Sequence, residues 1–130
     1  MIGFDQALGS HVQALRIQER RTALLAANLA NADTPGYKAR DIDFRAALAG
    51  ASEGPLPLLR TARGHLDAPG EGLAGGPALY RIPQQASLDG NTVEVATEQA
   101  AFAENAVRYQ ATLRFLGGRF QGLMNALRGE

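Results

Sequence analysis

The residues that could carry acid–base chemistry are few and lie in the middle of the chain. Asp41 and Asp43 are separated by one residue, and His65 follows within a glycine- and proline-rich stretch. Two carboxylates with a histidine can act as general acid and base in a hydrolase. Neither a nucleophile nor a phosphate-binding glycine loop accompanies them, so we interpret the two aspartates as the solvated face of an extended segment. The sequence predicts no enzyme; a small hydrolase built on these three residues is the enzymatic alternative.

Metal and cofactor sites are not indicated by the pattern of possible ligands. His11 has no second candidate ligand four residues further along its helix, so we interpret it as a polar interruption of a packing face. Gly72 and the Gly75-Gly76 pair lack the strand-to-helix setting of a dinucleotide fingerprint. The chain contains no cysteine, which excludes disulfides and zinc–thiolate sites. We expect no cofactor, no metal ion and no small-molecule substrate.

Length and charge limit the remaining function classes. The chain has 130 residues, enough for one domain, with 13 basic and 13 acidic side chains. This balance gives no sign of binding to nucleic acid or to an anionic membrane. No run approaches the ~18–20 apolar residues of a membrane span. The N-terminal residues lack the pattern of a cleavable signal, so we expect any export to use a route other than general secretion.

The stretch 27–38 is where the chain changes from a helical pattern to an extended, glycine-rich one. Pro35 has no N–H and disfavours the α conformation at the residue before it, so the helix is expected to end near Ala32 or Asp33. The segment Thr34–Tyr37 suits a type II turn, in which Gly36 supplies the positive φ. The helix before this turn and the extended segment after it therefore determine where the turn lies.

Two asparagines on the last turns of this helix have two open interpretations. Asn28 and Asn31 lie three residues apart and share one helix face. In the first interpretation, their amides only satisfy the last open carbonyls of the helix. In the second, they anchor a partner chain or the returning loop.

The overall pattern predicts a mostly α protein in which long N- and C-terminal helices form a coiled-coil-like hairpin. We assign residues 1–33 to the first helix, whose apolar stripe is interrupted at His11, Gln18 and Thr22. Residues 34–92 hold the turn, extended segments and a Gly/Pro-rich insert, and residues 93–130 form the last helix. From Arg45 onward the helical and strand periods are lost, so residues 46–78 are expected to be disordered in the free monomer.

The last helix carries the strongest apolar periodicity in the chain. A seam of large and small apolar residues alternates four- and three-residue steps without a polar interruption, namely Phe102, Ala106, Tyr109, Leu113, Leu116, Phe120, Leu123 and Leu127. Each large side chain contributes about 1.5–3 kcal/mol only if it is fully buried. The first helix has too thin a stripe to cover the whole seam, so we predict that other chains complete the packing. We place the start of the helix between Asn91 and Thr97, with Asn91 and Glu94 as a capping box.

Residues 28–38 resemble the N-terminal signature of the bacterial flagellar rod, hook and hook-associated proteins. The residues that carry this resemblance are Asn28, Asn31, Thr34, Pro35, Gly36, Tyr37 and Lys38. Residues 38–44, 87–93 and 108–111 are similar to the proximal-rod members of that family in particular. The similarity covers about residues 4–45 and 79–128, whereas the insert matches little. Ala96 departs from the pattern, because the family often has an acidic residue there.

This resemblance implies a structural subunit of the proximal rod in the flagellar basal body. Family members pack their terminal helices as concentric layers of a tube, leave the cytoplasm through the flagellar type III apparatus, and polymerise in the periplasm. The implied partners are copies of the chain, other rod proteins, the MS-ring adaptor protein and the export gate, with no nucleic acid. Related subunits engage the gate with a Phe-x-x-x-apolar element, of which Phe4 and Leu8 are either a copy or ordinary packing residues.

A soluble coiled-coil adaptor or a secretion chaperone is the alternative function. Such a protein would share the two helices, but it would have no reason for the Asn-x-x-Asn and Thr-Pro-Gly-Tyr pattern. Self-assembly at high concentration would separate the two hypotheses.

Overall fold

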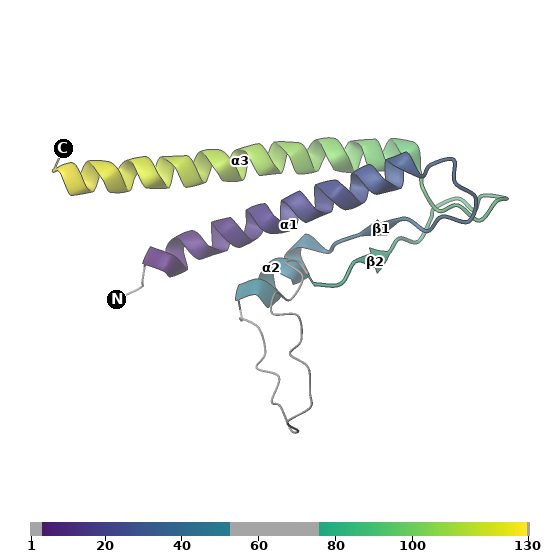
Figure 1. Ribbon diagram of the computed structural model, residues 1–130, viewed down its shortest axis with the longest axis horizontal. Helices are drawn as coiled ribbons and strands as arrows, with labels where there is room; N and C mark the ends of the chain where they lie inside the picture. The colour runs from purple at the N-terminus through teal and green to yellow at the C-terminus, as the bar shows by residue number, and fades with distance from the viewer. Residues whose placement is uncertain (1–3, 53–75, 130) are drawn as a thin grey trace, which may run out of the picture.

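The computed structural model of the protein describes residues 4–52 and 76–129. Helix α1 spans Phe4–Ala30 and helix α3 spans Val95–Arg128. The two helices run side by side along the length of the molecule, and α3 projects past the start of α1 (Figure 1). The prediction of a mostly α fold with long N- and C-terminal helices is therefore confirmed, whereas residues 53–75, most of the predicted disordered insert, lie outside the described residues.

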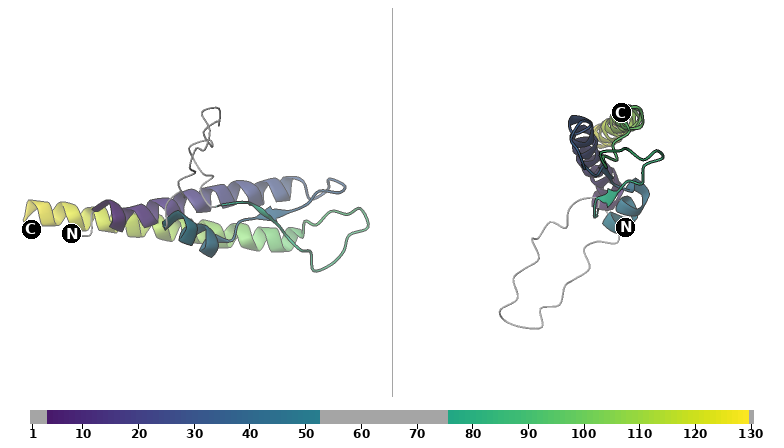
Figure 2. Two further views of the ribbon diagram at one scale, coloured as in Figure 1. Left: turned by 90° about the horizontal axis from the view of Figure 1, so that it is seen from below. Right: turned by 90° about the vertical axis from the view of Figure 1, so that its right-hand side faces the viewer.

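A short two-stranded ribbon lies beside the end of α1. Strand β1 (Arg40–Asp41) pairs antiparallel with strand β2 (Leu79–Tyr80), so that Arg40 faces Tyr80 across the ribbon. A third helix, α2, spans Phe44–Ser52 and packs against α1. Among the described elements, helix α1 contacts α3, α2 and strand β1, whereas β2 is joined to it only through β1. Figure 2 shows these elements from two further sides.

Helix α2 corrects the prediction that periodic structure is lost from Arg45 onward. Its N-terminus is capped by Asp43, whose Oδ1 accepts hydrogen bonds from the amides of Arg45 (3.0 Å) and Ala46 (3.1 Å). Its apolar residues recur at helical spacing and pack toward α1, namely Phe44, Ala47, Leu48 and Ala51. The helix has only nine residues, four of them alanine, so its apolar period is weak beside the glycine-rich stretch that follows.

The largest cluster of buried apolar side chains lies between α1 and α2, whereas Leu25 of α1, also fully buried, lies outside it. Ile17, Ile42 and Ala47 are its buried centre, and Leu24 is among the partly buried residues that pack against it. Burial of this cluster holds α2 and β1 on one side of α1. The opposite side of α1 is left to meet α3.

The contact between α1 and α3 is unusually polar. Asn105 of α3 is 1% exposed, and its Nδ2 donates 2.8 Å hydrogen bonds to the Gln18 carbonyl and to Thr22 Oγ1. One heptad further along, Gln18 Nε2 donates to Thr112 Oγ1 at 3.3 Å. One heptad earlier, Glu98 is fully buried. The column of α3 that faces α1 therefore consists of polar residues at heptad spacing, which favours one register of the two helices.

Among the described helices, none combines the length and apolar character that a membrane crossing requires.

Candidate functional site

The end of α1 is capped by a loop that is distant in sequence. Asn91 Nδ2 lies 3.0, 2.8 and 2.9 Å from the carbonyl oxygens of Asn31, Ala32 and Thr34. These three carbonyls belong to the turn that directly follows α1, and the buried Asn91 amide adds a side-chain donor to the backbone hydrogen bonds of that turn. The loop that precedes α3 is thereby fixed to the end of α1.

The role of Asn91 overturns the predicted capping box. The N-cap residue of α3 is Glu94, which makes no side-chain capping bond, and the helix begins at Val95. Glu94 Oε1 instead accepts the backbone N–H groups of Gln84 and Gln85, at 2.8 and 3.2 Å. A capping box needs Asn91 to cap its own helix, but its Nδ2 donates to the end of α1, and its Oδ1 accepts the amide of Val93 (2.7 Å), which precedes α3.

The Thr-Pro-Gly-Tyr turn is present and packs against the same loop. Gly36 has φ 72°, and the Tyr37 amide donates to the Thr34 carbonyl at 3.3 Å. The Gly36 amide donates to the Asp89 carbonyl at 2.9 Å, and Lys38 Nζ donates to the Gly90 carbonyl at 2.7 Å. The two motifs, 34–38 and 87–92, therefore form one structural unit.

Asn28 is the buried link between the two long helices and the ribbon. It is fully buried, and its Nδ2 donates to the Arg40 carbonyl at 2.8 Å and to Glu98 Oε2 at 3.0 Å. Its Oδ1 accepts the Arg40 amide at 3.1 Å. Asn31 differs, because its Nδ2 donates to the Ala27 carbonyl within its own helix. The two interpretations of these asparagines thus divide: Asn28 holds the returning chain, and Asn31 satisfies a helix carbonyl.

An arginine–carboxylate network surrounds this link. Arg21 donates to both oxygens of Asp41, at 2.8 and 3.0 Å, and Arg81 Nη2 donates to Asp41 Oδ2 at 2.6 Å. Arg81 Nη1 lies 3.1 Å from Glu98 Oε1, an ion pair whose angle falls short of a hydrogen bond. Arg81 thus bridges the ribbon to α3, while Arg21 ties the ribbon to α1.

The same network determines the acidity of Asp41. Burial alone would raise the pKa of this carboxyl, but its hydrogen bonds act in the other direction. The strongest comes from Arg21, followed by the Ile42 amide, with the charge of Arg21 adding to them, and the pKa lies below its ordinary value. Asp41 is therefore a structural anion clamped by two guanidinium groups.

The predicted acid–base candidates do not converge on a site. Asp41 is held by arginines and Asp43 caps α2, while His65 lies outside the described residues. Across residues 4–52 and 76–129, no group of three potential ligand side chains could hold a metal ion. The functional surface has to be sought on the helices.

The predicted seam of α3 consists of two heptad columns with different exposure. Its half-buried column adjoins α1 and contains Phe102, Tyr109, Leu116 and Leu123. Its exposed column contains Ala106, Leu113, Phe120 and Leu127, of which Leu113, Phe120 and Leu127 are 44, 50 and 86% exposed. The seam is turned partly away from α1, because the polar column through Asn105 faces that helix. Half of the seam is therefore open to a partner.

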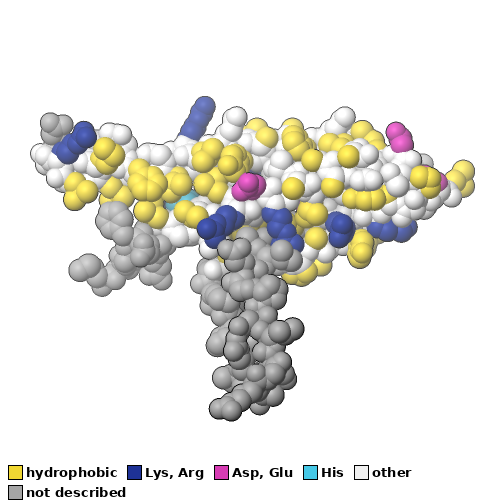
Figure 3. Space-filling model, viewed as in Figure 1, with side chains coloured by type: hydrophobic (Ala, Val, Ile, Leu, Met, Phe, Trp, Pro, Cys, Tyr) yellow, Lys and Arg dark blue, Asp and Glu magenta, His cyan; other side chains and the backbone are white. Residues whose placement is uncertain are grey.

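A groove lies between α1 and α3 along this open side. It encloses about 450 Å³ and is lined by Glu19, Thr22, Ala23, Ala26, Phe102, Ala106, Tyr109 and Gln110. Hydrophobic side chains are also spread along the face of α3 seen in Figure 3. Small side chains at Ala23, Ala26 and Ala106 would let another helix approach closely.

The predicted export element is only partly described. Leu8 is half-buried, and the side chain of Phe4 lies outside the described residues.

Comparisons with known proteins agree on one family. The family described as flagella basal body rod protein matches residues 8–38, which include most of α1 and the turn. A protein of Cereibacter sphaeroides named flagellar basal body rod protein FlgB is 55% identical over the whole length of both chains. Proteins with the same name from Salmonella typhimurium and Escherichia coli are 44 and 42% identical, covering 96 and 95% of this chain and 95 and 94% of theirs.

The chain belongs to the FlgB family of flagellar basal-body rod proteins. Membership of the FlgB family confirms the predicted resemblance and the prediction of a structural protein without enzymatic activity. It also places the chain in the flagellar basal body, as a rod component that assembles with other rod components.

Sequence reasoning missed the residues that hold the helices together. Glu98, Asn105 and Thr112 recur at seven-residue spacing, and Gln18 and Thr22 interrupt the stripe of α1. These polar interruptions were the available signal, because two polar columns at helical spacing can pair. A prediction based only on the apolar seam of α3 does not include these polar residues.

Proposed function

We propose that this chain is a subunit of the proximal rod that polymerises through its terminal helices. The observation that carries the proposal is the exposed column of the α3 seam, with Leu113, Phe120 and Leu127 open to solvent in the single chain. Full burial of such side chains stabilises by about 1.5–3 kcal/mol each. An isolated chain gains little from them, whereas a tube of packed helices gains the full amount.

The polar contacts between α1 and α3 also support this proposal. The junction at Asn28, Asn91 and Asp41 fixes how α1, α3 and the ribbon are held at one end of the molecule. The contacts further along α1 and α3 are polar and leave apolar surface outside. A subunit that assembles needs an exposed apolar face held in a fixed orientation.

Export of the chain through the flagellar type III apparatus and placement of the rod in the periplasm are further parts of the proposal. The MS-ring adaptor protein and the export gate are its proposed partners, in addition to other rod subunits. Phe4 and Leu8 are the proposed contacts with the gate. Phe4→Ala should then reduce the amount of chain exported without changing its folding, whereas an unchanged exported amount would assign Phe4 to packing.

The alternative of a soluble adaptor or secretion chaperone remains testable. Its observable difference is location, because a chaperone would stay in the cytoplasm and an exported subunit would be found in basal bodies. A deletion strain complemented with the wild-type gene provides the experiment. We expect the deletion to abolish swimming, and immunoblots of purified basal bodies to contain the complementing chain. Normal swimming of the deletion strain, or confinement of the chain to the cytoplasm, would contradict the proposed function.

A further inference from the structure

The charges of α3 and the loop before it are segregated along the chain. Residues 84–107 contain acidic side chains and neither lysine nor arginine, whereas residues 108–129 contain arginines and no acidic side chain. The overall charge balance conceals this separation. We call residues 113–128 the α3 tail; it is an amphipathic helix with arginines beside exposed apolar residues.

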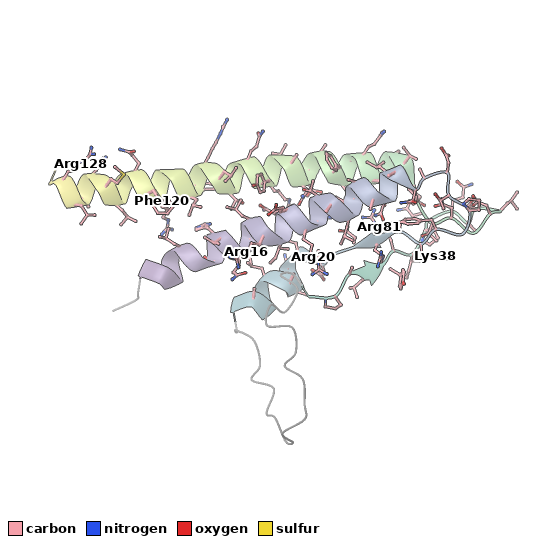
Figure 4. The ribbon with its side chains drawn as sticks, in the orientation of Figure 1. Arg16, Arg20, Lys38, Arg81, Phe120 and Arg128 are labelled. Atoms are coloured by element: carbon pink, nitrogen blue, oxygen red, sulfur yellow. The ribbon has the colours of Figure 1, made fainter. Side chains whose placement is uncertain are left out.

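The arginines of the α3 tail have no partner within the described chain. Arg108 pairs with Glu104 at 2.6 Å, but Arg114 and Arg128 make no hydrogen bond or ion pair with any residue of 4–52 or 76–129. The end of the tail also projects past α1 in two directions of view (Figures 1 and 2). Phe120 and Arg128 are labelled on it in Figure 4. Both the charges and the apolar side chains of the tail are therefore available to a partner.

The groove between α1 and α3 has the opposite character. Its apolar floor includes Phe102 and Ala106, and Glu19 lines its edge. Glu19 is exposed and has no hydrogen-bonding or ion-pair partner among the described residues. The unpaired carboxylate of Glu19 at the groove is thus opposite in charge to the unpaired arginines of the tail.

We propose that the α3 tail of one copy of this chain docks in the α1–α3 groove of a second copy. The tail would place Phe120, Met124 and Leu127 on the apolar floor, with its arginines on the side of Glu19. Phe120 to Leu127 covers about 10 Å of helix, and the groove residues of α3, Phe102 to Gln110, cover about 12 Å. The inference rests on the proposed function, because it names the partner of the assembly surface.

A chain cannot fill its own groove in this way. Ala106 in the groove and Met124 on the tail lie on one continuous helix, about 27 Å apart along its axis. Docking must therefore occur between copies, and it joins two different surfaces. Such a heterologous contact leaves one free groove and one free tail at the ends of every oligomer, so it produces an open chain.

Cysteine cross-linking tests the docking directly, because the chain has no native cysteine. The double variant Ala106→Cys/Met124→Cys, treated with a short bismaleimide, is expected to give a ladder of covalent oligomers. A mixture of the two single variants should give only dimers. The matched control is Ala111→Cys/Met124→Cys, because Ala111 is exposed on a different side of α3. An equal ladder from this control would overturn the proposed groove.

Charge reversal provides a second test of the docking. Glu19→Arg should lower the cross-linked yield about two- to fivefold, the range expected for exposed ion pairs. Reversal of Arg114 and Arg128 to Glu in the same chain should restore the yield. If reversal leaves the yield unchanged throughout, charge complementarity plays no part and the proposal fails. Tail-dependent binding to phosphatidylglycerol vesicles without any ladder would assign the tail to a membrane surface and also overturn it.

Complementation in cells distinguishes failure of this inference from failure of the proposed function. The double cysteine variant is introduced into the deletion strain, and basal bodies are cross-linked after purification. If the variant restores swimming but no 106–124 cross-link forms, the groove docking is wrong while the proposed function stands. If the purified chain gives the ladder but the deletion strain swims normally, docking stands and the proposed function fails.

Discussion

Asn28 of α1 donates a 3.0 Å hydrogen bond to Glu98 of α3, and both side chains are fully buried. This contact joins residues 70 positions apart in sequence at the junction between the helices and the ribbon. An amide–carboxylate pair in a buried setting is strong when both partners are present and costly when one is removed.

Glu98→Ala should therefore lower the free energy of unfolding by about 1–3 kcal/mol, because it leaves the buried Asn28 amide with one partner fewer. Glu98→Gln should lower it less, since the amide oxygen still accepts from Asn28 while the ion pair with Arg81 is lost. Urea unfolding followed by circular dichroism measures both. Equal losses for the two variants would show that the hydrogen bond contributes little.

Asn91→Asp should disrupt the cap at the end of α1. The substitution keeps the size of the side chain but places an acceptor oxygen against the carbonyls of Asn31, Ala32 and Thr34. We expect a loss of about 1–3 kcal/mol in the free energy of unfolding. Asn125→Asp is the control, because Asn125 is exposed and its Oδ1 already acts as an acceptor from Gln121. A control loss as large as that of Asn91→Asp would contradict the capping role.

The stability of the folded chain should depend on pH through Asp41. The pKa of Asp41 is lower in the folded chain than its ordinary value of about 3.9, so the unfolded state binds the proton first as the pH falls. The contribution of Asp41 is fully present above that ordinary value and is lost as the pH falls through the folded pKa.

Asp41→Asn should remove this part of the acid dependence and destabilise the chain at neutral pH. Asp43→Asn is the matched control, because asparagine also serves well as the N-cap of α2. Unfolding midpoints in urea between pH 7 and pH 3 provide the measurement. Retention by Asp41→Asn of the wild-type decline below about pH 4 would show that other carboxylates cause it.

The buried polar column should limit the stability of the hairpin. Within the described residues, Gln18 Oε1 and Asn105 Oδ1 are buried and accept no hydrogen bond. Replacing both side chains by leucine, Gln18→Leu/Asn105→Leu, should raise the free energy of unfolding by about 1–3 kcal/mol. The measurement is the urea midpoint at pH 7. A lower midpoint would mean that the polar contacts to Thr22 and Thr112 outweigh the unsatisfied oxygens.

The helices and the turn were predictable because their signals are local. Pro35 and Gly36 determine the turn through their own backbone preferences, and the seam of α3 recurs at a fixed spacing. The start of α3 was predicted only within several residues, because Glu94 at the N-cap makes no recognisable side-chain cap.

The junction was not predictable in the same way. The local pattern predicts Asn91 as a cap of the following helix, since sequence alone does not show that its side chain reaches the end of α1. Likewise, Asp41 and Arg81 are far apart in sequence and meet only because the ribbon pairs. Contacts of this kind depend on tertiary folding, which local patterns do not determine.

Whether Leu113→Asp enters the rod decides if the exposed column of the α3 seam drives assembly. Leu113 lies on the exposed column of the seam, and a charge there would oppose burial between subunits while leaving the α1–α3 junction intact. Ala111→Asp places the same charge on an exposed position outside the seam and serves as the control. We expect Leu113→Asp to be absent from purified basal bodies and to fail to restore swimming in the deletion strain, whereas Ala111→Asp is incorporated. Incorporation of Leu113→Asp at the wild-type level, with normal swimming, would contradict it.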